Sequence, residues 1–162
     1  MVKIKGLAEV LASHALFEGF DRETMDFLES CAANEAFAAG AYLFKADEPA
    51  DRFFLLREGS VALELQLPGR GRLSVQTLQE GQVVGASWLL PPYTWRFDAR
   101  ALTAVRATSI DAQCLRRKCD DNPALGYELM KRFLPILADR LQAARVQLVD
   151  LYAPAEPLRQ SQ

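Results

Sequence analysis

The sequence predicts a mainly β, α+β fold in which short helices come first, a β-sandwich or barrel follows, and a long helix comes last. Three observations predict it. Apolar residues recur at helical spacing before residue 31 and after residue 111. Between 34 and 111, roughly eight short runs suited to strands are separated by glycine-bearing turns, which excludes a parallel βαβ sheet. The length of 162 residues fits one domain.

Composition narrows the class of protein. Half of the residues are hydrophobic and a quarter are charged, which is enough for a globular core. A net charge of −2 argues against a broad nucleic-acid surface. No apolar run approaches the ~18 residues of a membrane span, and no signal-peptide pattern is present. We therefore expect a cytoplasmic protein with no membrane partner.

The three cysteines do not follow a metal-binding pattern. Cys31, Cys114 and Cys119 have no paired metal-ligand spacing, and their odd number suits a reducing cytosol. We interpret them as buried or incidental thiols, with an iron–sulfur or redox role as the alternative. The single histidine, His14, lacks a second ligand for a metal or haem.

Two short helices are predicted at the start of the chain. Apolar residues at helical spacing indicate an amphipathic helix over 4–13. Asp21 is a candidate N-cap for a second helix that ends at Cys31.

Period-two runs then predict the strands. A Pro-Gly turn at 68–71 favours a hairpin between the fourth and fifth of them. The predicted strands cover residues 34–38, 42–45, 51–57, 60–67, 73–78, 83–84, 97–103 and 105–111.

Helical spacing returns after residue 111. A short helix is predicted over 113–120, and Asn122-Pro123 is a strong start signal for a long helix that reaches about Leu151. Pro135 should kink that helix or remove one backbone hydrogen bond. We expect one domain in three parts: helices plus β-roll at 1–111, C-terminal helices at 112–153, and a flexible tail at 154–162.

The segment 82–101 differs from an ordinary connection. It contains both tryptophans of the chain, Trp88 and Trp95, and leaves through Arg96 and Arg100. Apolar rings with a few polar groups are typical of a small-ligand pocket. The alternative is that the rings close one end of the barrel.

Polar and apolar residues alternate over 96–101, where the chain re-enters a strand. The alternation predicts that Ala99 and Ala101 lie in the core and that Arg100 lies in solvent. Arg96 either binds an anion or is a surface or Asp98-paired arginine.

Spaced glycines carry a resemblance to a known family. They are found in Phe37–Leu43, in Phe54–Val61, in Leu78–Gly81 and at Gly85. With the order of the elements, they resemble the cyclic-nucleotide-binding domain, the sensor module of the catabolite activator protein (Crp/Fnr) family, over about residues 7–151. The resemblance implies a jelly-roll β-roll, a cyclic AMP or cyclic GMP ligand, and a stand-alone bacterial sensor that signals through a partner protein.

The family's phosphate-binding cassette looks like a Gly-Glu pair, a short helix and an Arg after a short loop. Its backbone N–H groups and arginine hold the cyclic phosphate, and its glutamate accepts the ribose 2′-OH. Here Gly85 fits, Ala86 replaces the glutamate, and Trp95 falls at the arginine spacing with Arg96 one place later. The lost charged acceptor weakens a nucleotide by roughly one to two decades. The candidate ligand-binding residues are Gly85, Ala86, Ser87, Trp88, Trp95, Arg96 and Phe97.

The sequence contains no catalytic constellation, so we expect a binding protein rather than an enzyme. We expect no DNA binding by this chain alone, since only about ten residues follow the long helix. Its near-heptad Leu134, Leu137, Leu141, Ala144 and Leu148 predict a homodimer, as the resemblance also implies. The alternatives are a ligand-free interaction domain, or the sensor half of a Crp/Fnr-type regulator without its helix-turn-helix.

Overall fold

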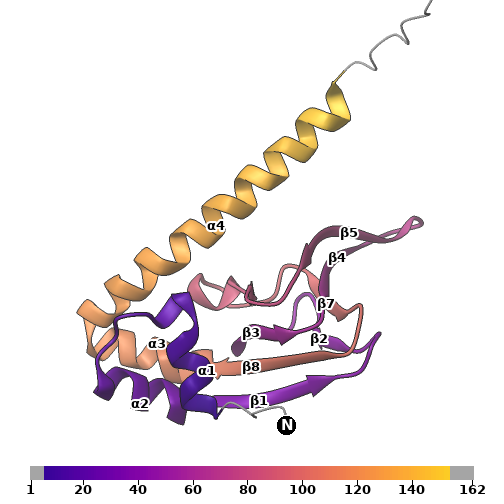
Figure 1. Ribbon diagram of the computed structural model, residues 1–162. Coiled ribbons are helices and arrows are strands. Elements are labelled where there is room, and N and C mark those ends of the chain that lie inside the picture. The colour runs from indigo at the N-terminus through magenta and orange to yellow at the C-terminus, as the bar shows by residue number, and fades with distance from the viewer. Residues whose placement is uncertain (1–5, 154–162) are drawn as a thin grey trace, which may run out of the picture.

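A computed structural model describes residues 6–153 of the chain. Two four-stranded antiparallel sheets, in the orders β1-β8-β3-β6 and β2-β7-β4-β5, form a β-roll. Helices precede and follow it, and the last helix, α4 (Pro123–Tyr152), extends far beyond the roll (Figure 1). This architecture confirms the predicted α+β jelly-roll fold. The strands are β1 Ala32–Phe37, β2 Tyr42–Phe44, β3 Arg52–Glu58, β4 Val61–Leu67, β5 Gly71–Leu78, β6 Val83–Val84, β7 Asp98–Ala101 and β8 Val105–Asp111.

The N-terminal helices follow the predicted capping pattern. They are α1 Leu7–Ser13, a 3₁₀ turn η1 at Ala15–Phe17, and α2 Arg22–Ser30. The Asp21 carboxylate accepts a hydrogen bond from the Thr24 backbone N–H at 2.8 Å, which confirms Asp21 as an N-cap. Residues 4 and 5 of the helix predicted over 4–13 lie outside the described residues.

The core lies on both faces of β3. Phe53 on one face meets Phe133 of α4 edge-on at 5.3 Å between ring centroids. Phe54 on the other face lies 6.3 Å from Phe44 of β2, which belongs to the opposite sheet. Because both faces are covered, four consecutive apolar residues of β3 are buried, and an alternating pattern is absent there.

The C-terminal helices are α3 Ala112–Asp121 and α4 Pro123–Tyr152. The Asn122 side chain accepts a hydrogen bond from the Leu125 N–H at 3.3 Å, and Pro123 occupies the first turn, as predicted. Pro135 lies inside α4, but the helix continues through it and shows no sharp kink (Figure 1). Only the hydrogen bond that proline cannot donate is lost.

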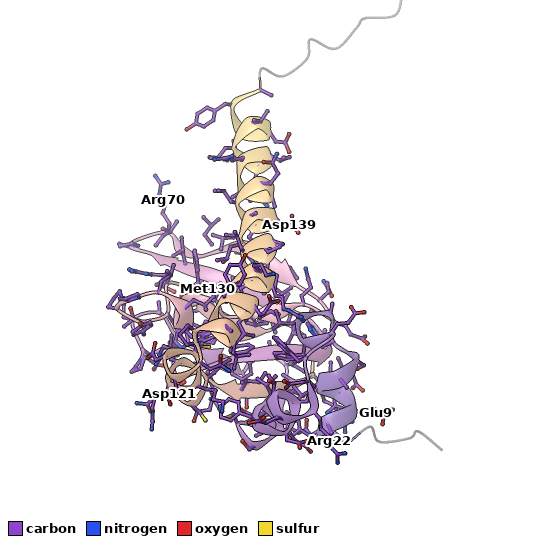
Figure 2. The ribbon with its side chains drawn as sticks, turned by 90° about the vertical axis from the view of Figure 1, so that its left-hand side faces the viewer. Glu9, Arg22, Arg70, Asp121, Met130 and Asp139 are labelled. Atoms are coloured by element: carbon purple, nitrogen blue, oxygen red, sulfur yellow. The ribbon has the colours of Figure 1, made fainter. Side chains whose placement is uncertain are left out.

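The two halves of α4 have different surroundings. In the first half, Leu125, Leu129 and Phe133 are buried against the roll. In the second half, Leu141, Leu148 and Leu151 are exposed. Figure 2 shows this difference along the helix, with Met130 beside the roll and Asp139 farther along it.

The remaining expectations concern the tail, the thiols and the membrane. The tail expected to be flexible, 154–162, lies outside the described residues. The three cysteines are free thiols and half-buried. Burial raises the pKa of Cys31 to about 11, with a further contribution from the neighbouring Cys114. Within 6–153, every helix is too short or too polar to cross a membrane.

Candidate functional site

The predicted site segment leaves β6 at Gly85, turns through a short 3₁₀ helix η2 at Ser87–Leu89, and returns into β7. Gly85 has a φ of +92°, a left-handed conformation that side chains with a Cβ rarely adopt. A Cβ at this position would also lie 2.7 Å from two ring carbons of Trp95. A glycine at 85 is therefore required by its backbone angle and by its neighbour.

A cavity of about 380 Å³ lies between this loop, the second sheet and α4. Six of the seven predicted site residues line it, namely Gly85, Ala86, Ser87, Trp95, Arg96 and Phe97. Its walls are mostly apolar. The volume falls in the ~300–1,000 Å³ range of small-molecule sites.

Trp88, the seventh predicted residue, does not line this cavity. It is only 1% exposed, because η2 directs its ring into the core. The ring stacks on Phe53 at 5.0 Å and meets Phe133 edge-on at 5.3 Å. Trp88 therefore does not line this cavity with the other predicted residues, and its ring packs in the core between β3 and α4.

Trp95 is also buried, but it forms part of the cavity wall. Its ring stacks on Phe44, with the centroids 3.7 Å apart and the planes 10° from parallel. By spacing from Gly85, Trp95 stands where the family's cassette has its arginine. At this position the chain presents a flat apolar surface and no cation.

Arg96 is exposed and lines the cavity. The alternative pairing with Asp98 is not formed, since the Asp98 carboxylate instead accepts a hydrogen bond from the Ala46 N–H at 2.8 Å. Within 6–153, Arg96 forms no salt bridge, so its guanidinium is available at the rim of the cavity.

Arg100 is only partly in solvent, with its side chain 24% exposed, because it forms an ion pair that the alternation does not predict. Its guanidinium donates two hydrogen bonds to the Glu64 carboxylate, at 2.7 Å and 3.0 Å. Strands β4 and β7 are neighbours, and their register places Glu64 beside Asp98 and Arg100 beside Ala62, one diagonal step apart. The Arg100 hydrogen bonds lower the pKa of the buried Glu64 carboxyl. Ala99 and Ala101 are fully buried, as predicted.

The sequence did not reveal the α4 side of the cavity. Helix α4 contributes Leu137, Arg140, Leu141, Ala143, Ala144 and Gln147 to the lining. The guanidinium of Arg140 reaches back and donates a hydrogen bond to the Val83 carbonyl, directly before the loop. Burial lowers the pKa of Arg140. The only sequence signal for this side of the cavity was Arg140 next to the near-heptad leucines, and an arginine in such a place is common on surface helices.

His14 connects the N-terminal turn to the turn between β5 and β6. Its Nδ1 accepts a hydrogen bond from the Leu16 N–H at 3.1 Å, and its Nε2 lies 2.9 Å from the Gly81 carbonyl. Both ring nitrogens are thus engaged, and within 6–153 no group of three potential ligands could hold a metal ion. His14 acts here as a structural link.

The β-roll, the glycine turn, the short 3₁₀ helix and the cavity beside a long helix define the class of fold: a β-roll domain whose loop after β6 faces its C-terminal helix across a cavity. The sequence profile of the cyclic nucleotide-binding domain matches residues 34–122, more than half of the chain. The chain therefore belongs to the cyclic nucleotide-binding domain family.

Relatives and solved structures agree. The chain is 28% identical over 144 residues to a CRP-like cAMP-activated global transcriptional regulator of Mycobacterium tuberculosis, covering 88% of this chain and 62% of that protein. It is 28% identical to the HTH-type transcriptional regulator Cmr of the same species, covering 87% and 56%. The chain thus spans about three fifths of these relatives.

Among solved structures, a putative cyclic nucleotide-binding protein from Geobacter metallireducens superposes with a TM-score of 0.76 at 29% identity. That comparison covers 83% of this chain and 97% of the other. The catabolite activator protein of Thermus thermophilus gives a TM-score of 0.64 at 20% identity, over 84% and 62%, and shows the common fold.

Proposed function

We propose that this chain is a sensor domain that binds a small molecule in the cavity between the β-roll and α4, and that it signals to a partner protein. The carrying observation is that the loop 85–97 and α4 form opposite sides of one cavity. A ligand there contacts both elements at once, so its binding favours one position of the loop and helix over another. The proposed role is binding and not catalysis.

Cyclic AMP and cyclic GMP are the first ligands to test, because the chain belongs to the cyclic nucleotide-binding domain family and one relative is a cAMP-activated regulator. In the Trp88→Phe variant Trp95 is the only tryptophan, so its fluorescence reports on the cavity wall. We expect a saturable change on titration, with weak affinity because Ala86 offers no acceptor to a ribose hydroxyl.

Three variants provide the controls for that titration. Arg96→Ala should weaken binding of a phosphate, since its guanidinium is at the cavity rim. Ala144→Phe should block the cavity, whereas Ala138→Phe adds the same ring at an exposed position that does not line it. No response to either nucleotide at millimolar concentration would reject cyclic-nucleotide sensing and leave another small molecule as the ligand.

Dimerisation through α4 is the second part of the proposal. Leu134, Leu141 and Leu148 are seven residues apart and 65%, 54% and 53% exposed, which is the spacing of a coiled-coil seam. Light scattering over a concentration series should show a dimer, and Leu148→Asp should shift it toward monomer. A monomer at all concentrations would reject this part.

The stack of Trp95 on Phe44 supports a second candidate function, a ligand-free interaction domain. In that case the ring is a permanent wall and the cavity stays unoccupied. This candidate would be favoured if cyclic AMP, cyclic GMP, 2-naphthoate and 2-naphthamide all failed to bind.

A further inference from the structure

The cavity between the roll and α4 has an uneven charge. Of the side chains that line it, only Arg96 and Arg140 are ionised at neutral pH, and no aspartate or glutamate is among them. A mostly apolar wall with two cations and no anion attracts a negatively charged ligand. The two arginines come from opposite sides, Arg96 from the loop and Arg140 from α4.

Arg140 differs from the other arginines that donate to backbone carbonyls. Arg116 donates to the Trp88 carbonyl and also lies over the Tyr93 ring at 4.2 Å. Arg132 donates to the Leu16 carbonyl and lies over the Phe20 ring at 4.1 Å. Within 6–153, Arg140 has the Val83 carbonyl but neither an aromatic ring nor a carboxylate.

A guanidinium has five N–H donors in a planar fork that matches a carboxylate. In Arg140 one carbonyl leaves most of these donors without a protein acceptor in the described chain. Burial of a charge without a counter-ion is unfavourable, and the lowered pKa of Arg140 reflects it. An anionic ligand in the cavity would remove this penalty.

The remaining walls indicate the body of such a ligand. The stacked rings of Trp95 and Phe44 form part of the wall, with only a small part of each ring exposed, and Leu63, Phe97 and Leu137 add apolar surface around them. Where the family's cassette has a glutamate carboxylate, this chain has the methyl group of Ala86, which cannot form a hydrogen bond with a sugar hydroxyl. These walls suit an aromatic ring better than a ribose.

We propose that the cavity binds a small aromatic carboxylate, with its ring beside Trp95 and its carboxylate bound by Arg140. This inference rests on the proposed function and names the ligand class for the same cavity. The anion is then held by α4 and not by the loop. Ligand binding acts directly on the helix that extends beyond the roll.

The test uses 2-naphthoate and 2-naphthamide, which share a ring system and differ in charge. Calorimetric titration of the full chain should show naphthoate binding at least about tenfold more tightly, since hydrogen bonds to charged groups are the stronger ones. Arg140→Gln should weaken naphthoate binding about tenfold to a hundredfold and leave naphthamide binding unchanged. Arg145→Gln is the matched control, because it removes the same charge from an exposed position of α4 outside the cavity lining.

Arg140→Lys provides a second variant if Arg140→Gln does not fold. It keeps the charge but not the planar fork, so part of the preference for naphthoate should remain. Equal affinity for the two compounds, or equal effects of Arg140→Gln and Arg145→Gln, would overturn the inference and leave small-molecule binding intact. If neither naphthalene compound binds, the inference is overturned, and if the cyclic nucleotides also fail, so is the proposed function.

Discussion

The two halves of the loop between β6 and β7 each contain one tryptophan, and the two rings have different environments. The first half carries Trp88 into the core, where Phe53 and Phe133 enclose it. The second half places Trp95 on the wall of a cavity. Arg116 of α3 fixes the first half by a hydrogen bond of 2.9 Å to the Trp88 carbonyl.

The difference shows how one loop combines anchorage with recognition. The first half is attached to the helices and to β3, so it cannot move without disturbing the core. The second half faces the cavity, where a ligand can replace solvent. We therefore expect substitution of Trp88 to affect mainly stability, and substitution of an exposed cavity-lining residue such as Arg96 to affect mainly binding.

The largest expected effect separates the two tryptophans. Trp88→Ala should reduce the free energy of unfolding by about 5 kcal/mol, at the upper end for a buried aromatic residue, because it leaves a void between β3 and α4. Trp95→Ala should cost about 3 kcal/mol, at the lower end, because the new space joins an existing cavity. Urea denaturation of both variants measures the difference, and equal losses would contradict the comparison.

A smaller effect is expected where the loop begins. Gly85→Ala should cost about 1–3 kcal/mol, since the new Cβ meets the Trp95 ring and φ is +92°. In the double variant with Trp95→Leu the clash is relieved but the strained angle remains. Denaturation of the four proteins of this cycle should give a loss for the double variant that is smaller than the sum of the single losses. Additive losses would show that Trp95 does not restrict position 85.

The ion pair behind the second half should have a still smaller effect. Glu64→Gln should cost about 1 kcal/mol, because solvent reaches Arg100 and screens the pair. The pKa of Glu64 is lowered from its ordinary 4.5, so its contribution to stability is present above that pH. It is lost as the pH falls through the pKa of the folded state. Thermal melts at acidic pH should therefore show a weaker pH dependence in Glu64→Gln than in the parent.

The smallest effect concerns His14, which binds the turn before the first half of the loop. Burial lowers its pKa below the ordinary 6.5, so the unfolded chain takes up a proton at higher pH than the folded one. The stabilisation that neutral His14 contributes is complete above about pH 6.5 and decreases as the pH falls below that value. Protonation of Nδ1 also removes the acceptor for Leu16.

His14→Gln should cost no more than about 1 kcal/mol at neutral pH, the value of a partly exposed hydrogen bond. Stability measured over about pH 7 to 5 should change less in this variant than in the parent. An unchanged slope would show that His14 is not the titrating group.

The sequence by itself determined the elements and their order. Alternation and turn residues predicted the strands, and Asp21 and Asn122 predicted two helix starts that the structure confirms. These signals are local, since a cap or a turn depends on residues only a few positions apart. The spaced glycines were enough to indicate the family before any comparison.

Only the tertiary structure decided what each site residue contacts. The distance along the chain between Glu64 and Arg100 is 36 residues, and between Val83 and Arg140 it is 57, so no local pattern could pair them. The two tryptophans are seven positions apart in one loop and could not be told apart by composition. The direction of the backbone at η2 and the surfaces of β3 and α4 placed Trp88 in the core, while Phe44 and Gly85 held Trp95 at the cavity.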